Sequence, residues 1–118
     1  MTESQFQSRL LKALRSHPAL KDAVIFKHSD RFSRGIPDFS VTVNARTTWW
    51  EVKVAPGKTT KIQSWFLAKL GACAFVIKAS SDGRWVEIFN ATYGRGTQFA
   101  SAIEEIVEQA VGGRKINA

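Results

Sequence analysis

The sequence predicts an α/β domain in which a mixed β-sheet is flanked by helices. A first helical pattern is followed by three short runs with strand character. A second helix then leads to two further strands and a last helical segment. A three-stranded meander followed by a helical crossover to another strand gives a mixed sheet. At 118 residues, the chain is expected to form a single domain spanning residues 1–118.

The first half of the chain is predicted to hold one helix and three strands. Residues 3–16 form the helix, since apolar residues recur at helical spacing and Thr2 and Gln5 make an N-terminal capping box. The strands are rich in β-branched and aromatic residues and cover 24–26, 36–43 and 47–54. Residues 28–35 form a polar, basic loop, and residues 44–46 form the turn between the second and third strands.

The second half is predicted to add two helices and two strands. A helix over residues 61–70 ends at Gly71, a residue that suits the position after a helix. The two strands cover 72–78 and 85–89, joined by a turn at Ser81-Asp82-Gly83. Thr97 caps a last helix over residues 98–111, so that the full order is αβββαββα.

Two acids and a lysine lie on the second and third predicted strands. Side chains alternate along a strand, so Glu51 and Lys53 point to the same face. If the two strands pair as an antiparallel hairpin, Asp38 can lie almost opposite Glu51, about 5 Å away at Cβ. Carboxylates this close repel each other without a cation, and hard oxygen ligands favour Mg²⁺, with Mn²⁺ as a substitute. The alternative is a surface pair in which each acid faces a nearby base.

Two further residues are weaker candidates. Glu3 lies three positions before Phe6 on the apolar face of the first helix, so we expect it to point inward, where a metal site would explain it. The alternative is that Glu3 stands at the start of the helix to favour the helix dipole. Gln63 has a structural explanation, because Thr60 and Gln63 form a capping box.

The charge of the chain points to a polyanionic partner. Lys and Arg number 17 against 10 Asp and Glu, which gives a net charge of +7. A domain this basic commonly binds nucleic acid, and the alternative is that the charge serves only solubility. Basic residues gather around the candidate carboxylates, which favours nucleic-acid binding. The proposed nucleic-acid contacts are Lys27, Arg31, Arg34, Lys58 and Lys61.

The remaining composition predicts an intracellular, cytoplasmic protein with no membrane association. A single cysteine, Cys73, excludes an internal disulfide and fits a reducing compartment. No apolar run approaches the roughly 20 residues of a membrane span. The N-terminus reads as polar and helical, unlike a secretory signal.

In their order and spacing, these short motifs resemble the VRR-NUC family of the PD-(D/E)xK nuclease superfamily. The matching pieces are Gly35-Ile36-Pro37-Asp38, Glu51-Val52-Lys53, Gly57-Lys58, Gln63, Trp65, Leu67, Leu70, Gly71 and the strand 74–77. The likeness covers about residues 3–80. It implies the restriction-endonuclease-like core of that superfamily, with the order αβββαβ.

The resemblance also implies a role for each matching residue. The catalytic positions fall on Asp38, Glu51, Lys53, Gln63 and Glu3. Asp38 and Glu51 would ligate the metal, together with the carbonyl of Val52. Lys53 would orient or activate the attacking water and stabilise the pentacovalent phosphate, and Gln63 would orient the site from the second helix. The chain resembles stand-alone phage and bacterial members, several of which act as homodimers on branched DNA.

The leading hypothesis is therefore a Mg²⁺-dependent, structure-selective DNA endonuclease. A homodimer would suit four-way (Holliday) junctions, since two-fold symmetry presents two sites to opposite strands. A monomer would suit flaps or nicks. A catalytically silent nucleic-acid-binding module is the alternative from a different class. A sequence-specific restriction-type enzyme ranks lowest, because no insert for reading base edges is evident.

Overall fold

The structure, a computed structural model, describes residues 1–28 and 35–90 and the backbone of residues 98–100. The helices are α1 (Glu3–Ser16), η1 (Pro18–Leu20), α2 (Lys61–Leu70) and η2 (Gly71–Cys73), where η denotes a short 3₁₀ helix. The strands are β1 (Val24–Lys27), β2 (Phe39–Val43), β3 (Arg46–Val54), β4 (Ala74–Ala79), β5 (Val86–Asn90) and β6 (Gln98–Ala100).

Most predicted elements are confirmed, with corrections to strand starts and to the last helix. Residues 72–73, predicted to begin the fourth strand, belong to η2. The second strand begins at Phe39 and not at Ile36, because Pro37 has no N–H to donate to a strand ladder. Residues Gln98–Ala100 form a strand where a helix was predicted, since they pair antiparallel with β5. The remaining positions of that predicted helix, 101–111, lie outside the described residues.

The strands form one mixed sheet in the order β1-β2-β3-β4-β5-β6. Every neighbouring pair is antiparallel except β3 and β4, which are parallel. Parallel neighbours need a crossover connection, and the segment that contains α2 provides it. The predicted mixed sheet with flanking helices is therefore confirmed.

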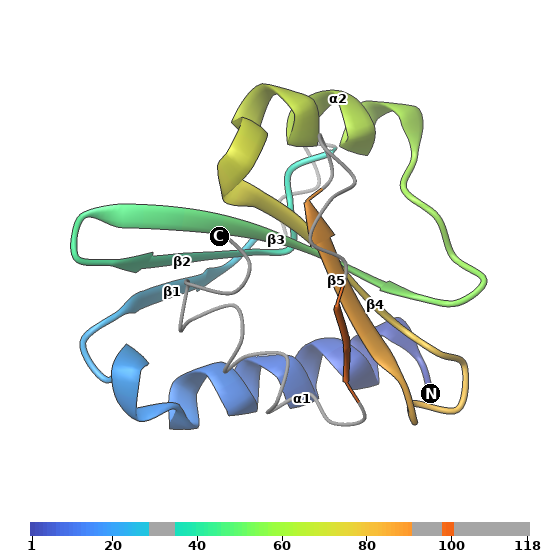
Figure 1. The fold of residues 1–118 in the computed structure, drawn as a ribbon, viewed down its shortest axis with the longest axis horizontal. Helices are drawn as coiled ribbons and strands as arrows, with labels where there is room; N and C mark the ends of the chain where they lie inside the picture. The colour runs from blue at the N-terminus through green and yellow to red at the C-terminus, as the bar shows by residue number, and fades with distance from the viewer. Residues whose placement is uncertain (29–34, 91–97, 101–118) are drawn as a thin grey trace.

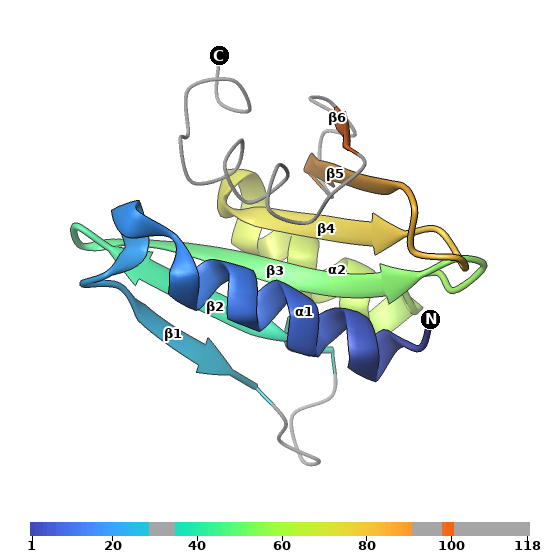
Figure 2. The same cartoon turned by 90° about the horizontal axis from the view of Figure 1, so that it is seen from below.

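The two long helices cover opposite faces of the sheet, with α2 above and α1 below in Figure 1. Figure 2, viewed from below, shows α1 in front of the sheet and α2 behind it. Phe6, Leu10 and Leu14 recur along one side of α1 and are fully buried against the sheet. Burying each such side chain stabilises the fold by about 1.5–3 kcal/mol. The main core lies on this face, between α1 and the sheet.

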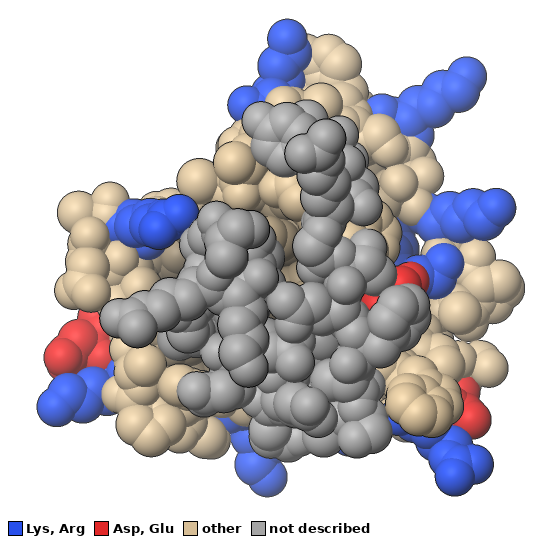
Figure 3. All heavy atoms as spheres, viewed as in Figure 1, with Lys and Arg blue, Asp and Glu red and all other residues tan. Residues whose placement is uncertain are grey.

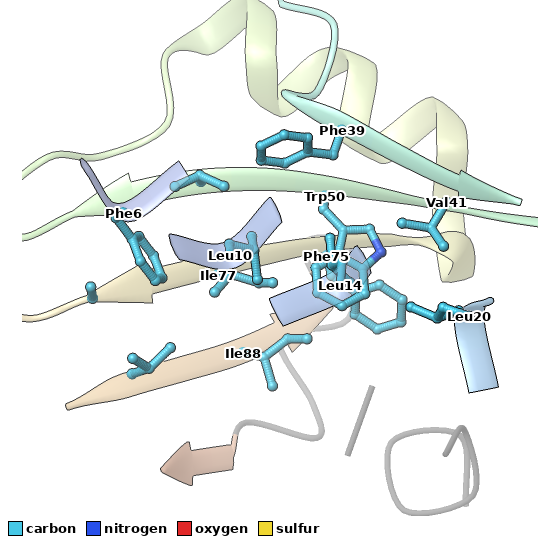
Figure 4. Packing of buried hydrophobic residues seen from close by; sticks show 13 residues of the cluster. Phe6, Leu10, Leu14, Leu20, Phe39, Val41, Trp50, Phe75, Ile77 and Ile88 are labelled. Atoms are coloured by element: carbon cyan, nitrogen blue, oxygen red, sulfur yellow. The ribbon is translucent and has the colours of Figure 1, made fainter. Parts of the chain in front are cut away.

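Figure 4 shows the packing of this main core, which α1 and the sheet form together. Its sheet residues include Val52 of β3, and those labelled in the figure are Phe39, Val41, Trp50, Phe75, Ile77 and Ile88. A smaller cluster lies on the other face, where Leu67 of α2 packs on Ala74 and Val76 of β4. Trp49 packs against the smaller cluster, and Trp50 lies in the main core, as alternation along β3 requires.

Both long helices begin with the predicted capping boxes. The Thr2 hydroxyl accepts a hydrogen bond from the Gln5 N–H, and the Gln5 side chain accepts one from the Thr2 N–H. Thr60 and Gln63 make the same reciprocal pair at the start of α2. These bonds satisfy N–H groups that a helix end otherwise leaves without partners.

The segment before β2 passes close beneath α2 at Gly35. Gly35 has a φ of +88°, in a region that residues with a Cβ rarely adopt. A Cβ at this position would lie 2.7 Å from Cδ2 of Phe66 and 3.0 Å from the carbonyl oxygen of Ile62. Glycine therefore allows the chain to approach α2 just before it reaches Asp38.

A two-residue turn joins β2 to β3 and sets their register. The predicted turn 44–46 was one residue too long, because Arg46 already belongs to β3. Asn44 and Ala45 both have positive φ, 53° and 62°, and Val43 pairs with Arg46 across the turn. Positive φ at both central residues is the type I′ pattern that suits the twist of a hairpin. The turn thereby fixes which residues of the two strands face each other.

Candidate active site

Asp38 and Glu51 are brought together by the register of β2 and β3. Phe39 pairs with Trp50, so continuing the register by one residue sets Asp38 opposite Glu51. The two carboxyl groups act on each other, since Asp38 helps to raise the pKa of Glu51. The predicted juxtaposition of these two acids is present.

Asp38 is held from both sides. Its Oδ2 atom accepts a hydrogen bond of 2.7 Å from the backbone N–H of Val52. Its backbone carbonyl accepts one of 2.8 Å from the His28 N–H, which extends the pairing of β1 and β2 by one residue. Asp38 therefore has a fixed position although it lies just before the first residue of β2.

Glu51 is a buried acid with little compensation for its charge. The residue is 1% exposed, and within the described part of the chain its Oε2 atom has no hydrogen-bond partner. Burial first, and then the closeness and negative charge of Asp38, raise the pKa of Glu51 to about 9. An unpartnered carboxylate oxygen in such a place is costly, so the position favours a bound cation or a proton.

Lys53 supplies a positive charge beside the acids. It is buried on the same face of β3 as Glu51, two residues along the strand. Its ammonium lowers the pKa of both Glu51 and Glu3, against the larger effect of burial that raises each pKa. Lys53 is thus electrostatically coupled to acids from two different elements.

Glu3 joins the acidic group from α1, but not in the way that the sequence predicted. The residue is exposed and does not point into the core, because the first turn of a helix has no preceding turn to cover it. Its carboxyl group is nevertheless partly desolvated, which raises its pKa, and it feels the charges of Lys53 and Asp38. Glu3 is therefore exposed, but lies close enough to interact electrostatically with Lys53, Asp38 and Glu51.

The Val52 carbonyl is directed to the same side as Asp38. The N–H and C=O of one strand residue point toward the same neighbouring strand, and the Val52 N–H binds Asp38. Two carboxylates and this carbonyl oxygen are ligands of the kind that Mg²⁺ uses when substrate phosphates and waters complete its shell. Among the residues that the structure describes, no group of three His, Cys, Asp or Glu side chains is arranged to hold a metal. The donor set therefore fits a divalent cation whose remaining ligands are waters or substrate phosphates.

Gln63 is engaged in the helix cap. Its Oε1 atom accepts a hydrogen bond of 2.9 Å from the Thr60 N–H, and its own N–H donates to the Thr60 hydroxyl. These bonds account for the residue structurally. The expected role of Gln63 in orienting the site stays a prediction that rests on the family resemblance.

The predicted phosphate contacts divide into three groups. Lys58 and Lys61 are exposed at the start of α2, the helix that covers the same face as Glu51. Lys27 pairs with Phe39, whose side chain lies in the core between the sheet and α1, so alternation directs Lys27 to the opposite face from Glu51. Arg31 and Arg34 lie outside the described residues.

Figure 3 shows Lys and Arg side chains projecting at several places around the edge of the face that it draws. Within the described residues, no helix has the length and apolarity that crossing a membrane requires. These basic side chains are compatible with a polyanionic partner, which stays a prediction.

Two features near the acids were not predicted from the sequence. Lys78 of β4 pairs with Lys53 across the parallel strands, which sets a second lysine beside the first. The rings of Phe26, His28 and Trp49 follow one another in a row, with 6.3 Å and 5.4 Å between successive ring centroids. Alternation in the sequence gives the face of each residue, but only the strand register brings them together.

No protein-family model, no curated protein and no solved structure matches this chain. The likeness to VRR-NUC nucleases therefore rests on the short motifs alone. The function of this chain is accordingly inferred from its geometry together with that resemblance.

Proposed function

We propose that this chain is a metal-dependent, structure-selective DNA endonuclease with the restriction-endonuclease-like core of VRR-NUC proteins. The observation that carries the proposal is the pair of Asp38 and Glu51, with the buried Oε2 atom of Glu51 lacking a partner among the described residues. Two acids held this close favour a divalent cation, because a cation removes their mutual repulsion. The net charge of +7 adds an affinity for polyanions.

Asp38, Glu51 and the Val52 carbonyl would hold the ion. A bound Mg²⁺ or Mn²⁺ supplies charge neutralisation at the phosphate and a lower pKa for a coordinated water. Lys53, on the face of Glu51, would orient the water that attacks phosphorus and would stabilise the negative charge that develops as the ester bond to the leaving oxygen breaks. Asp38 stays in position throughout, because the Val52 and His28 N–H groups restrain it.

The proposed substrate is branched DNA, with Holliday-type junctions favoured if the protein acts as a homodimer. Two copies related by a two-fold axis would present two sites to symmetric strands of one junction. A monomer would act instead on flaps or nicks. Sedimentation at micromolar concentration tests this point, and a monomer would remove the argument for junctions while leaving the chemistry intact.

The deciding experiment is a cleavage assay on an end-labelled four-way junction, a flap and a linear duplex, in Mg²⁺, Mn²⁺ and EDTA. Glu51→Gln and Lys53→Met proteins would run beside the wild type. Glu87→Gln is the matched control, because Glu87 is a half-buried acid on the same face of the sheet, on β5. We expect cleavage to be lost with chelator and in both site variants and kept in the control.

Cleavage that survives Glu51→Gln would reject the assigned site. If no DNA is cut with either metal while binding persists, the chain is better described as a nucleic-acid-binding module with a nuclease-like fold. A thermal melt of each variant separates loss of chemistry from loss of folding.

A further inference from the structure

Three aromatic rings form a continuous row on the α2 face of the sheet. His28 lies between Phe26 and Trp49, with interplanar angles of 30° and 27°, so the rings are stacked. The Nε2 atom of His28 and the Ser40 hydroxyl are 2.8 Å apart, which fixes the imidazole plane. We call Phe26, His28 and Trp49 the aromatic row.

The aromatic row borders the candidate active site. Phe26 pairs with Ser40, and Ser40 pairs with Trp49, so these residues cross three strands on one face. The His28 N–H binds the Asp38 carbonyl, which sets His28 in line with Asp38 and Glu51. Trp49 precedes Glu51 by two residues, about 6.6 Å along the strand. A nucleotide whose phosphate lies at the acids can therefore reach the row with a base.

The two ends of the row differ in what covers them. Trp49 packs against the small cluster formed by α2 and β4. Phe26 lies on strand β1, at the edge of the sheet, and is 60% exposed. The row therefore has one anchored end and one end open to a flat ligand.

We propose that the aromatic row is a stacking site for an unpaired nucleobase next to the phosphodiester bond that is cut. Charge favours this occupant, since the chain carries a net charge of +7 and Lys58 and Lys61 are exposed on the α2 side. Every base has a π-face that can stack on an aromatic side chain, and such stacking tolerates any sequence. The identity of the ligand as DNA rests on the proposed function.

A stacked base at this position narrows the substrate class. Inside a continuous duplex, both faces of a base are covered by its neighbours, so no base can stack on Phe26 without leaving the helix. Single strands, flaps and strand-exchange points offer bases with a free face. DNA with unpaired nucleotides beside the cut is accordingly the preferred substrate, and uninterrupted duplex is disfavoured.

The test measures binding in EDTA by fluorescence anisotropy, so that it does not depend on metal or cleavage. The probes are a labelled thymidine decamer, a decamer of the same charge with abasic sites, and a blunt duplex. The variants are Phe26→Ala, Phe26→Trp and Val24→Ala. Val24 is the matched control, because it lies two residues away on the same edge strand and face and is 52% exposed.

We expect Phe26→Ala to weaken binding to the thymidine strand by about tenfold. The same variant should leave binding to the abasic strand unchanged within about twofold. The Phe26→Trp protein, which keeps an aromatic ring, should bind the thymidine strand about as well as the wild type. Val24→Ala should bind all three probes like the wild type.

Equal weakening by Phe26→Ala on thymidine and abasic strands would overturn the proposal, as would equal effects of Phe26→Ala and Val24→Ala. A change in sedimentation of Phe26→Ala without a base-dependent loss would also overturn it and would assign the row to contact with a second copy. Base-dependent binding without any cleavage would keep the stacking site and reject the nuclease. Cleavage without base-dependent binding would keep the nuclease and reject the stacking site.

Discussion

The carboxylate of Asp38 accepts a hydrogen bond from the backbone N–H of Val52 at 2.7 Å, so a side chain takes the place of the strand ladder where β2 has not yet begun. This bond ties the acid just before β2 to the residue between Glu51 and Lys53 on β3. The spacing of the candidate site is thus set by backbone geometry, which is less variable than contacts between long side chains.

Replacing Glu51 with glutamine should abolish cleavage without lowering the stability of the metal-free protein near pH 7.5. The glutamine has nearly the shape of the protonated acid, and burial already raises the pKa of Glu51 to about 9. We expect the affinity for Mg²⁺ to fall at least tenfold, measured from the rise in melting temperature with Mg²⁺ concentration. A Glu51→Gln protein that melts several degrees lower in EDTA would contradict this expectation.

The stability of the metal-free protein should depend on pH through Glu51. The unfolded chain loses this proton near the ordinary pKa of 4.5, whereas the folded chain keeps it up to about pH 9. Between these pH values the folded state holds more protons than the unfolded state. The contribution of Glu51 to the free energy of unfolding therefore decreases as pH rises, by at most about 1.4 kcal/mol per pH unit. Urea unfolding in EDTA at pH 5.5, 7 and 8.5 measures the slope. The slope should be smaller in Glu51→Gln, and an equal slope in both proteins would assign it to other groups.

Replacing Lys53 with methionine should slow cleavage more than it weakens metal binding. The ammonium is placed to act on charge that develops in the transition state, and the loss of one such group typically lowers the rate by about 10²–10³-fold. Single-turnover cleavage at saturating DNA and Mg²⁺ gives the rate. Lys69→Met is the control, because Lys69 lies on α2 with its ammonium over the Trp65 ring and not beside the acids. Equal losses in both variants would point to a general effect of charge.

Replacing Gly35 with alanine should destabilise the fold by about 1–3 kcal/mol. The new Cβ would lie 2.7 Å from Phe66 and would also require a φ of +88°. Gly71→Ala is the matched control, since Gly71 has a φ of +67° but a Cβ added there would meet no atom within 4 Å. Urea unfolding should give the larger loss for Gly35→Ala. Equal losses would show that backbone conformation alone, and not the contact with α2, requires glycine.

Replacing Ala45 with glycine should stabilise the protein by about 0.5–1 kcal/mol. Ala45 has a φ of 62°, where a Cβ costs about 1–2 kcal/mol, and the flexibility of glycine offsets part of that gain. The melting temperature should rise by a few degrees, with cleavage unchanged because the turn lies at the far end of the hairpin from the acids. A lower melting temperature would argue against the type I′ turn.

The closeness of Asp38 to Glu51 was predictable from two local rules, although the predicted turn 44–46 was one residue longer than the observed one. Side-chain alternation gives the face of each residue, and a short turn between the strands limits the register to few choices. Both capping boxes were predictable for the same reason, since each depends on residues three positions apart.

Other features depend on contacts that no local pattern contains. Lys78 lies beside Lys53 only because α2 returns the chain to a parallel strand in one particular register. Gln98 belongs to a strand because β5 offers it a partner, which overrides a helical pattern in the sequence. The exposure of Glu3 follows from its place in the first turn of α1, where hydrophobic periodicity says little about burial.

The buried acid at position 51 lowers the stability of the metal-free fold at the centre of the sheet. A sheet that contained glutamine or leucine there would avoid the desolvated oxygen of Glu51. Divalent cations should therefore protect the native state against heat and proteases even in the absence of DNA, by mass action on the folded form. The folded state would then be most stable at the cation concentrations that the proposed cleavage also requires.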